Sequence, residues 1–316
     1  MTSKGWGLTE TPRIAVLLPC YNEEAAIAQT VAGFRAALPG AIVYVYDNNS
    51  SDRTMEVARA AGAVVRSERM QGKGKVVRRI FADIDADIYV MADGDATYDP
   101  ASAAAMVARV SDEGLDMIVG TRVHEAADAY RRGHVLGNRM MTGILAGLFG
   151  RSFTDIFSGY RVFSRRFVKS FPVLSAGFEI ETEISVHALE LKMPVGEVET
   201  RYFARPEGSV SKLSTWSDGY RIARTILTLY RIERPMLFFG VIAAVLALLA
   251  LGLSVPLVVT YLETGLVPRF PTAILATGLM ILAALCGFTG LILDTVVRGR
   301  REVRRLAYLG QPGPLR

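Results

Sequence analysis

The stretch YVMADGDATYDP, residues 89–100, joins an apolar run to two closely spaced aspartates. The apolar residues up to Ala92 predict a buried strand, and the turn after it contains Asp93 and Asp95, separated by Gly94. Two carboxylates this close repel each other, and both are costly to remove from water. Mg²⁺ or Mn²⁺ relieves that repulsion, because such hard cations prefer oxygen ligands. The pattern therefore indicates a metal site, with the glycine leaving room for a phosphate to approach.

The first 120 residues alternate between short apolar runs and amphipathic segments, which predicts βαβ units in a mostly parallel sheet. Ligands of such sheets bind beyond the carboxyl ends of the strands. Three polar clusters follow expected strands: PCYNEE (19–24), DNNSSDRT (47–54) and DGD (93–95). We therefore expect a single site built by three loops. The expected strands cover residues 13–18, 42–46, 64–65, 88–92 and 117–119.

Two long segments, residues 235–262 and 270–293, contain no charged residue. Each exceeds the roughly 20 helical residues that cross a hydrocarbon core of about 30 Å. The loop between them has one basic residue, whereas the flanks before and after the pair are rich in arginine. Basic flanks stay on the cytoplasmic side. The pattern predicts a multi-pass protein of the cell inner (plasma) membrane, with a two-helix transmembrane hairpin and a cytoplasmic catalytic domain.

The composition predicts four parts: a catalytic domain (1–213), an interfacial amphipathic helix (214–234), the hairpin (235–297) and a basic cytoplasmic tail (298–316). In the second part, apolar residues recur at helical spacing and arginines lie largely off that face. The alternative is an ordinary amphipathic helix packed on the catalytic domain. The net charge is +5, with basic residues concentrated around the membrane segments, which favours anionic lipid headgroups as partners and no nucleic acid.

Five segments in order resemble motifs of one enzyme family. The chain resembles the family 2 glycosyltransferases of the GT-A fold, a Rossmann-like α/β fold, and within them the polyprenyl-phosphate (dolichol-phosphate) sugar transferases. The resemblance covers residues 13–213, and the hairpin follows as in the bacterial members. The five segments are LLPCYNEE (17–24), YDNNSSDRT (46–54), DGD (93–95), SGYRVFSRR (158–166) and RPEGSVSKL (205–213).

The resemblance implies the roles of individual residues. A divalent ion, Mg²⁺ or Mn²⁺, would be held by Asp93 and Asp95, and Asp47 would accept a hydrogen bond from a uracil imide. The implied acceptor-phosphate site comprises Arg161, Arg205 and Lys212. The implied nucleotide-sugar site comprises Pro19, Tyr21, Glu23, Asp47, Asn48, Lys73 and Asp93, and the candidate catalytic residues are Asp95, Arg161, Asp155 and Glu181.

Two positions depart from the family pattern. Asn48 stands where the family has a second aspartate, which leaves the base preference open. Thr97 and Asp99 follow the metal motif where the family often has a glutamine, so either could be a third ligand. Lys73 lies in QGKGK (71–75), which can cradle a phosphate at a helix N-terminus or form a simple exposed loop.

The segment GFEIETEIS, residues 177–185, contains three glutamates at alternate positions. On a strand all three would share a face, whereas on a helix only Glu179 and Glu183 would. Glu181 is expected either to act as a base or to orient the arginines of the acceptor site. The alternative is a solvated acidic face.

The expected activity is inverting transfer of a sugar from a UDP- or GDP-linked donor to a polyprenyl phosphate. A lipid phosphate needs no general base, because its second pKa is about 6. One alternative is a processive polysaccharide synthase, but the chain has no Gln-X-X-Arg-Trp motif and only two spans. The other is a non-catalytic lipid-phosphate binder on a GT-A scaffold. The resemblance also implies a homo-oligomer, a tetramer by analogy.

Overall fold

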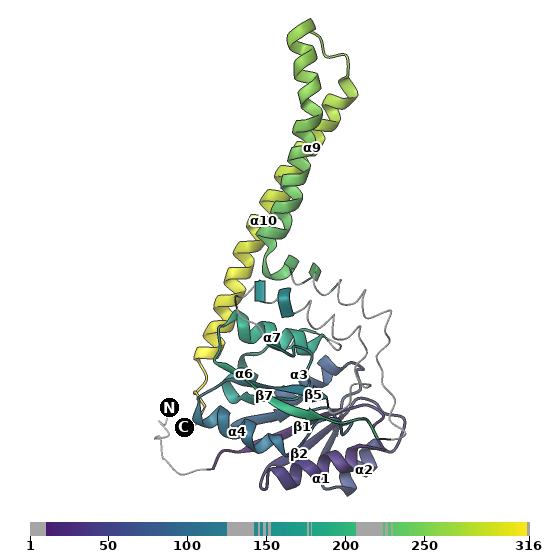
Figure 1. Ribbon diagram of the computed structural model, residues 1–316, viewed down its shortest axis with the longest axis vertical. Coiled ribbons are helices and arrows are strands. Elements are labelled where there is room, and N and C mark those ends of the chain that lie inside the picture. Colours follow the sequence, from purple (N-terminus) through teal and green to yellow (C-terminus); the bar gives the residue numbers. More distant parts are fainter. Residues whose placement is uncertain are drawn as a thin grey trace. The chain divides into compact units, whose positions relative to one another are not determined.

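The computed structural model describes residues 11–124, 142–144, 146–147, 150, 153–175, 177, 179–206, 224, 227–228 and 230–314. The chain forms two compact units. The first comprises residues 1–218 together with 304–316, and the second comprises residues 219–303. Figure 1 shows the sheet and its helices in the first unit and the long helices α9 and α10.

A seven-stranded sheet forms the centre of the first unit, in the order β3-β2-β1-β4-β6-β5-β7. All neighbouring strands are parallel except β6, which is antiparallel to β4 and β5. The expectation of a mostly parallel α/β sheet is therefore confirmed. The strands are β1 (Ile14–Cys20), β2 (Ile42–Asp47), β3 (Val64–Ser67), β4 (Ile88–Met91), β5 (Met117–His124), β6 (Arg161–Ser164) and β7 (Val195–Tyr202).

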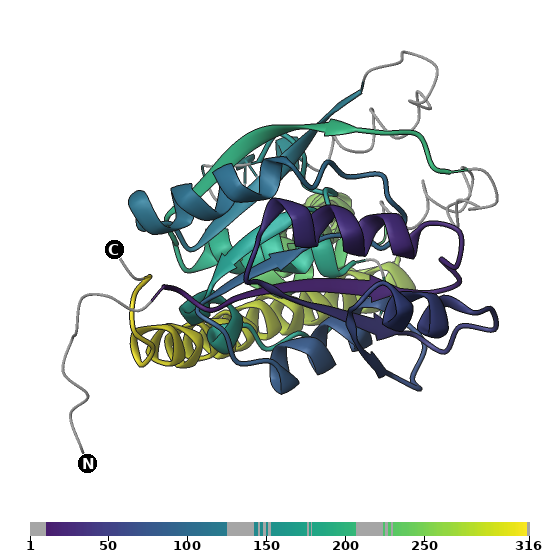
Figure 2. The same cartoon turned by 90° about the horizontal axis from the view of Figure 1, so that it is seen from below.

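Helices cover both faces of this sheet (Figure 2). Alternate residues of each strand point to opposite faces, so each face needs its own apolar layer. One layer contains Val16 and Val90 with Phe34 of α1 and Met106 of α4. The opposite layer is aromatic, with Phe163 of β6 packed on Phe81 and Phe167. The helices of this unit are α1 (Ile27–Ala37), α2 (Thr54–Ala60), α3 (Lys73–Asp83), α4 (Ser102–Asp112), α6 (Arg165–Ser170) and α7 (Ile180–Glu190).

Helix α7 is buried on nearly every side, because nine of its eleven residues are buried. It settles the two alternatives for the 177–185 segment in favour of helix. Glu179 is exposed before the first turn, and Glu183 accepts backbone hydrogen bonds from Leu174 and Ser175. Glu181 points the other way and is only 4% exposed.

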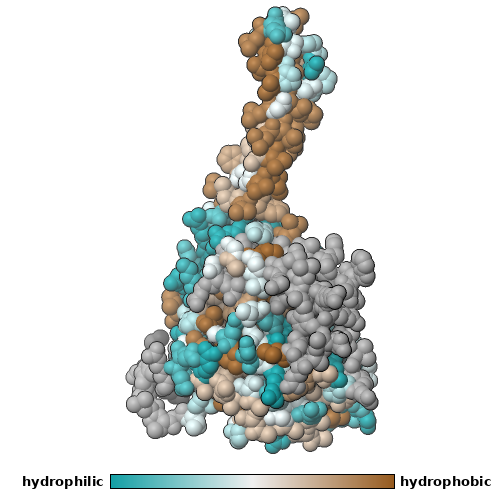
Figure 3. Space-filling model, in the orientation of Figure 1, coloured by the Kyte–Doolittle hydropathy of each residue, from teal (hydrophilic) through white to brown (hydrophobic). Residues whose placement is uncertain are grey.

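The second unit contains α9 (Pro235–Thr264) and most of α10 (Phe270–Leu309). Both helices are long and apolar enough to cross a membrane. Their contact uses small residues: a side chain at Gly290 would lie 3.2 Å from Phe239 Cβ and 3.4 Å from Met236 Cα. Figure 3 shows an almost continuous hydrophobic surface along these helices, as expected for a transmembrane hairpin.

The expected basic tail from residue 298 is not a separate element. Helix α10 continues without a break to Leu309, because no proline follows the apolar run within it and a single glycine, Gly299, is tolerated. Arg300 and Arg301 form ion pairs with the buried Glu233 inside the second unit. From Arg304 onward the chain belongs to the first unit. The expected interfacial helix, residues 214–234, lies mostly outside the described residues.

A buried histidine in α7 makes the stability of the first unit depend on pH. His187 is 1% exposed, its Nδ1 has no hydrogen-bond partner among the described residues, and its ring packs on Phe167 and Phe171. Burial, with a smaller effect from Arg304, lowers the pKa of His187 from 6.5 to about 3. The unfolded chain therefore binds more protons between these two values, and stability falls as the pH falls through that window.

We predict that His187→Gln flattens this pH dependence. Lowering the pH from about 7 to about 5 should cost the wild type about 2 kcal/mol through His187 alone. Gln retains a group for Ser170 but does not ionise in this range. The measurement is the thermal unfolding midpoint of the full chain in detergent at both pH values. An unchanged slope in the variant would contradict the assignment.

Candidate active site

Three loops meet at the carboxyl edge of the sheet, as the sequence predicts. The parallel register pairs Cys20 at the end of β1 with Asp47 at the end of β2. It also pairs Leu17 of β1 with Met91 at the end of β4. The backbone of Asn48 donates to the carbonyl of Cys20 at 2.8 Å, so the loops after β1 and β2 begin side by side.

Asp47 presents an unused acceptor at this edge. It is 1% exposed, and its Oδ2 accepts a hydrogen bond from the Ser50 backbone at 3.0 Å. Its Oδ1 is buried without a hydrogen-bond partner in the described part of the chain. A buried acceptor without a partner carries a desolvation cost, which a ligand N–H can remove. Nearby on β1 and its loop, Pro19 and Glu23 are buried and Tyr21 is half-buried.

The side chain of Asn48 points to the backbone of its own chain and not to the space beside Asp47. Its Nδ2 donates to the carbonyls of Glu68 and Met70, at 3.1 and 2.9 Å, and its Oδ1 accepts from the Gly72 backbone at 2.8 Å. Both amide donors are therefore used on the chain itself. The expected direct contact of Asn48 with the nucleotide does not fit this arrangement. Its side chain instead fixes the loop that leads into α3.

Lys73 begins α3 and stands between two carboxylates. Its Nζ lies 2.5 Å from Asp93 Oδ1 and 2.5 Å from Glu181 Oε1. Burial lowers the pKa of Lys73, but the two carboxylates outweigh burial and hold the pKa above its ordinary value. The preceding Gly72 has φ 132°, which only glycine adopts readily. Residues 73–75 are therefore the first turn of a helix and not a simple exposed loop, although Gln71 before them is exposed.

Asp95 has its own cation. Its Oδ2 lies 2.6 Å from Arg205 Nη2, and its Oδ1 accepts from Thr97 Oγ1 at 2.6 Å. Burial first, and then the charge of Asp93, raise the pKa of Asp95, against the effect of Arg205. The Thr97 hydroxyl is thus used by Asp95, and Asp99 accepts from the Ala101 backbone and from Ser102, the first residue of α4. Neither arrangement supports the expectation of a third metal ligand.

Two glycines shape the surroundings of these aspartates. A side chain at Gly159 would lie 2.8 Å from Asp93 Oδ2, so the glycine lets this carboxylate pack against the backbone. A side chain at Gly94 would lie 2.3 Å from Cys20 Sγ. A glycine is therefore required at position 94 because the turn packs on β1. The sequence predicts a different cause, namely room for a phosphate.

Arg161 is not at the surface of the site. It is fully buried, and burial lowers the pKa of its guanidinium to about 10, which leaves it charged at neutral pH. The guanidinium donates to the carbonyls of Ile156 and Ser158 and to Ser185 Oγ, at 2.6, 2.9 and 2.9 Å. Direct contact with an acceptor phosphate, as expected, is not compatible with this burial. Arg161 instead fixes the segment that contains Gly159.

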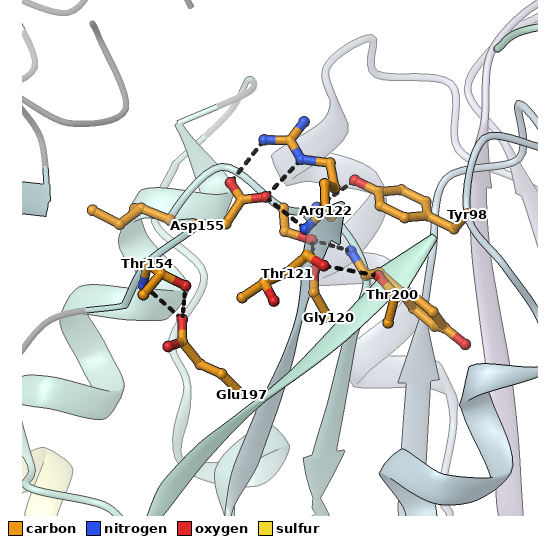
Figure 4. A network of polar contacts seen from close by, with 12 residues as sticks. Tyr98, Gly120, Thr121, Arg122, Thr154, Asp155, Glu197 and Thr200 are labelled. Carbon is orange, nitrogen blue, oxygen red and sulfur yellow. Dashed lines mark hydrogen bonds and ion pairs between the residues drawn. The ribbon is translucent and has the colours of Figure 1, made fainter. Parts of the chain in front are cut away.

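Asp155 likewise has a structural partner (Figure 4). Both of its oxygens accept from the Arg122 guanidinium, each at 2.7 Å. Burial lowers the pKa of Arg122, but Asp155 holds it well above its ordinary value. The same segment is held by hydrogen bonds from Thr154 to Glu197, also visible in Figure 4. Asp155 therefore supports this segment through Arg122, and its expected catalytic role stays a prediction.

Of the expected acceptor-phosphate residues, Arg205 faces the site through Asp95, and Lys212 lies outside the described residues. Sequence reasoning missed the links from Lys73 to Glu181 and from Arg122 to Asp155. Each of these ion pairs joins residues more than 30 positions apart, so no local sequence motif predicts it. The sequence feature that could have indicated the Arg122–Asp155 pair is an arginine near the end of an apolar strand, in GTRVH (120–124).

We predict that Asn48→Asp weakens the loop before α3. A carboxylate would face the carbonyls of Glu68 and Met70, and two acceptors would lose their donors. The free energy of unfolding should fall by about 2 kcal/mol. Asn49→Asp is the matched control, since that side chain is exposed in the same loop. A changed base preference at unchanged stability would instead support direct reading of the base by Asn48.

Comparisons with known proteins place the chain in a family. The chain matches the profile of Glycosyl transferase family 2 over residues 15–171. It is 35% identical over 250 residues to glycosyltransferase AglJ of Haloferax volcanii, covering 78% of this chain and 81% of the relative. The chain therefore belongs to glycosyltransferase family 2.

Two further comparisons concern a relative and a solved structure. A dolichyl-phosphate hexose transferase of Haloferax volcanii is 26% identical over 221 residues, covering 70% of this chain and 95% of the relative. Glucosyl-3-phosphoglycerate synthase from Mycobacterium tuberculosis, solved with Mn²⁺, UDP and glucosyl-3-phosphoglycerate, superposes with a TM-score of 0.56 at 22% identity. That superposition covers 69% of this chain and 79% of the solved one, and the shared fold is GT-A.

Proposed function

We propose that this glycosyltransferase moves a sugar from a nucleotide diphosphate sugar to a polyprenyl phosphate at the cytoplasmic face of the membrane. One observation carries the proposal: Asp47 Oδ1, a buried acceptor without a partner among the described residues, lies at the same sheet edge as the ion-paired carboxylates Asp93 and Asp95. Asp47 Oδ1 can accept a hydrogen bond from the base of a nucleotide. The two carboxylates can hold a cation that binds the diphosphate of the same nucleotide.

The donor site consists of the loops after β1 and β2. Asp47 Oδ1 would accept the imide N–H of a uracil, which removes the cost of the unpaired atom. Pro19, Tyr21 and Glu23 would form the walls for the base and ribose. The Mycobacterium tuberculosis synthase of the same fold binds UDP with Mn²⁺, which favours a uridine donor.

Asp93 and Asp95 fit a divalent ion. Each now holds one cation, Lys73 or Arg205, so positive charge is already drawn to this position. Among the described residues no group of three or more His, Cys, Asp or Glu side chains could hold a metal. Two carboxylates suffice for Mg²⁺ or Mn²⁺ when phosphates and waters complete the shell. Such an ion supplies counter-charge for the leaving diphosphate.

The remaining chemistry follows from the chain's own residues. Lys73 and Arg205 would contribute positive charge toward the diphosphate and acceptor phosphates, and Lys212 would join them. An acceptor phosphate oxygen attacks the anomeric carbon as the bond to the diphosphate oxygen breaks, which inverts the configuration. No proton has to be removed, because the lipid phosphate is largely dianionic at neutral pH. Glu181 would then hold Lys73 in place and would not act as a base.

The apolar helices α9 and α10 favour a lipid acceptor. Both helices have the length and the apolar composition of membrane spans. In addition, one relative of this chain is named a dolichyl-phosphate hexose transferase. The loop between them contains one basic residue, Arg269, whereas the flanks are rich in arginine. This asymmetry favours a cytoplasmic catalytic domain.

We predict metal-dependent transfer that Asp95→Asn abolishes. The full chain in lipid nanodiscs is incubated with radiolabelled UDP- or GDP-sugars, polyprenyl phosphate and Mn²⁺ or Mg²⁺, and label in the lipid extract is counted. Asp95→Asn should lower transfer by about 100-fold or more, because the leaving group loses stabilisation. Excess EDTA should have the same effect on the wild type.

The matched control is Asp112→Asn, which removes an exposed carboxylate of α4 away from the site. It should transfer as the wild type does. Wild-type transfer that persists in EDTA would contradict the role of the metal. Nucleotide-sugar binding without transfer to any lipid phosphate would contradict the proposed reaction.

A further inference from the structure

Helix α7 has a buried carboxylate at each end. Glu181, in the first turn, lies 2.5 Å from Lys73 in the site. Glu190, the last residue of the helix, has a side chain with no exposed surface and lies 2.6 Å from Arg304 Nη1. A buried carboxylate needs a partner, and losing that partner costs far more than losing a surface ion pair. Among the described residues, each end of α7 is therefore held by a carboxylate paired with a cation.

The cation at the far end comes from the C-terminal part of α10. Tyr308 lies one turn after Arg304, so both project from the same side of the helix. The Tyr308 hydroxyl donates to Asp116 Oδ2 at 2.8 Å, and Arg166 stacks over the Tyr308 ring at 4.8 Å. Asp116 is fully buried. We call residues 304–309 the C-terminal strap, which is anchored at these two points within the first unit.

The middle of α7 contacts the segment that supports Asp93. Ser185 Oγ accepts from Arg161 at 2.9 Å and donates to the carbonyl of Glu181 at 3.0 Å. Arg161 in turn fixes the segment with Gly159, which packs against Asp93. An eleven-residue helix is about 16 Å long and moves as a rigid body. Displacement at Glu190 is therefore transmitted to the contacts at Glu181.

We infer that Arg304 is a positioning residue of the active site, and that the strap sets the placement of α7 and through it the Glu181–Lys73 pair. The inference rests on the proposed function for its kinetic readout. Arg304 touches no substrate. It acts by holding Glu190, so its loss should affect the step in which charge develops on the leaving diphosphate.

The experiment compares Arg304→Ala with Arg304→Lys in the full chain in nanodiscs, well below the unfolding midpoint of each variant. Arg304→Ala should lower kcat by about 10-fold and raise KM for the nucleotide sugar much less. Lys keeps the charge near Glu190 and should recover most of kcat. Arg305→Ala, at the exposed neighbouring position, should behave as the wild type.

Hydrogen exchange of the α7 backbone gives a second readout that needs no activity. Arg304→Ala should accelerate exchange at residues 180–185, the end nearest the site, whereas Arg305→Ala should not. Wild-type kcat in Arg304→Ala, equal impairment of Arg304→Lys, or unchanged exchange at 180–185 would each overturn the inference. A wild-type protein that transfers no sugar would overturn the proposed function instead, and the exchange comparison would still decide the role of Arg304.

Discussion

The ammonium group of Lys73 links the elements that form the site. Lys73 stands between Asp93 and Glu181, which come from the end of β4 and the start of α7. The side chains of Lys73 and Glu181 are only 11% and 6% exposed, and charges so far removed from water are tolerated only when partners lie close by. The starts of α3 and α7 and the end of β4 are thus required to meet at one point. The surrounding features, from the positive φ of Gly72 to the hydrogen bonds of Asn48, serve that requirement.

The carboxylates of the site are compensated before any substrate arrives. Asp93 pairs with Lys73 and Asp95 pairs with Arg205, while one oxygen of Asp47 has no hydrogen-bond partner in the part of the chain that the structure describes. Binding of a donor with its metal ion would exchange these partners and would not expose bare charges to each other. The cations at this edge are thus in place before charge develops on a substrate, which is the arrangement that favours electrostatic catalysis.

The boundaries that hydropathy predicts in the C-terminal part of the chain differ from those of the two structural units. The loss of apolar residues after position 293 marks the end of a span, but it says nothing about where the following helix packs. Arg304 and Tyr308 belong to the first unit, although the sequence suggests a solvated basic tail. Charged residues beside a membrane segment are readily assigned to lipid headgroups, and here Arg304 instead neutralises Glu190.

The sequence by itself determined the class of fold, the hairpin and the sheet edge that holds the site. Periodicity and the lack of charge are local properties, and parallel strands bring their carboxyl ends to one edge wherever they occur. The tertiary structure decided which side chains enter the site. It buried Arg161 behind the site, turned Asn48 to the backbone and selected Glu181 from three alternating glutamates. These outcomes depend on partners far apart in the chain, because burial and pairing are settled only when the elements pack.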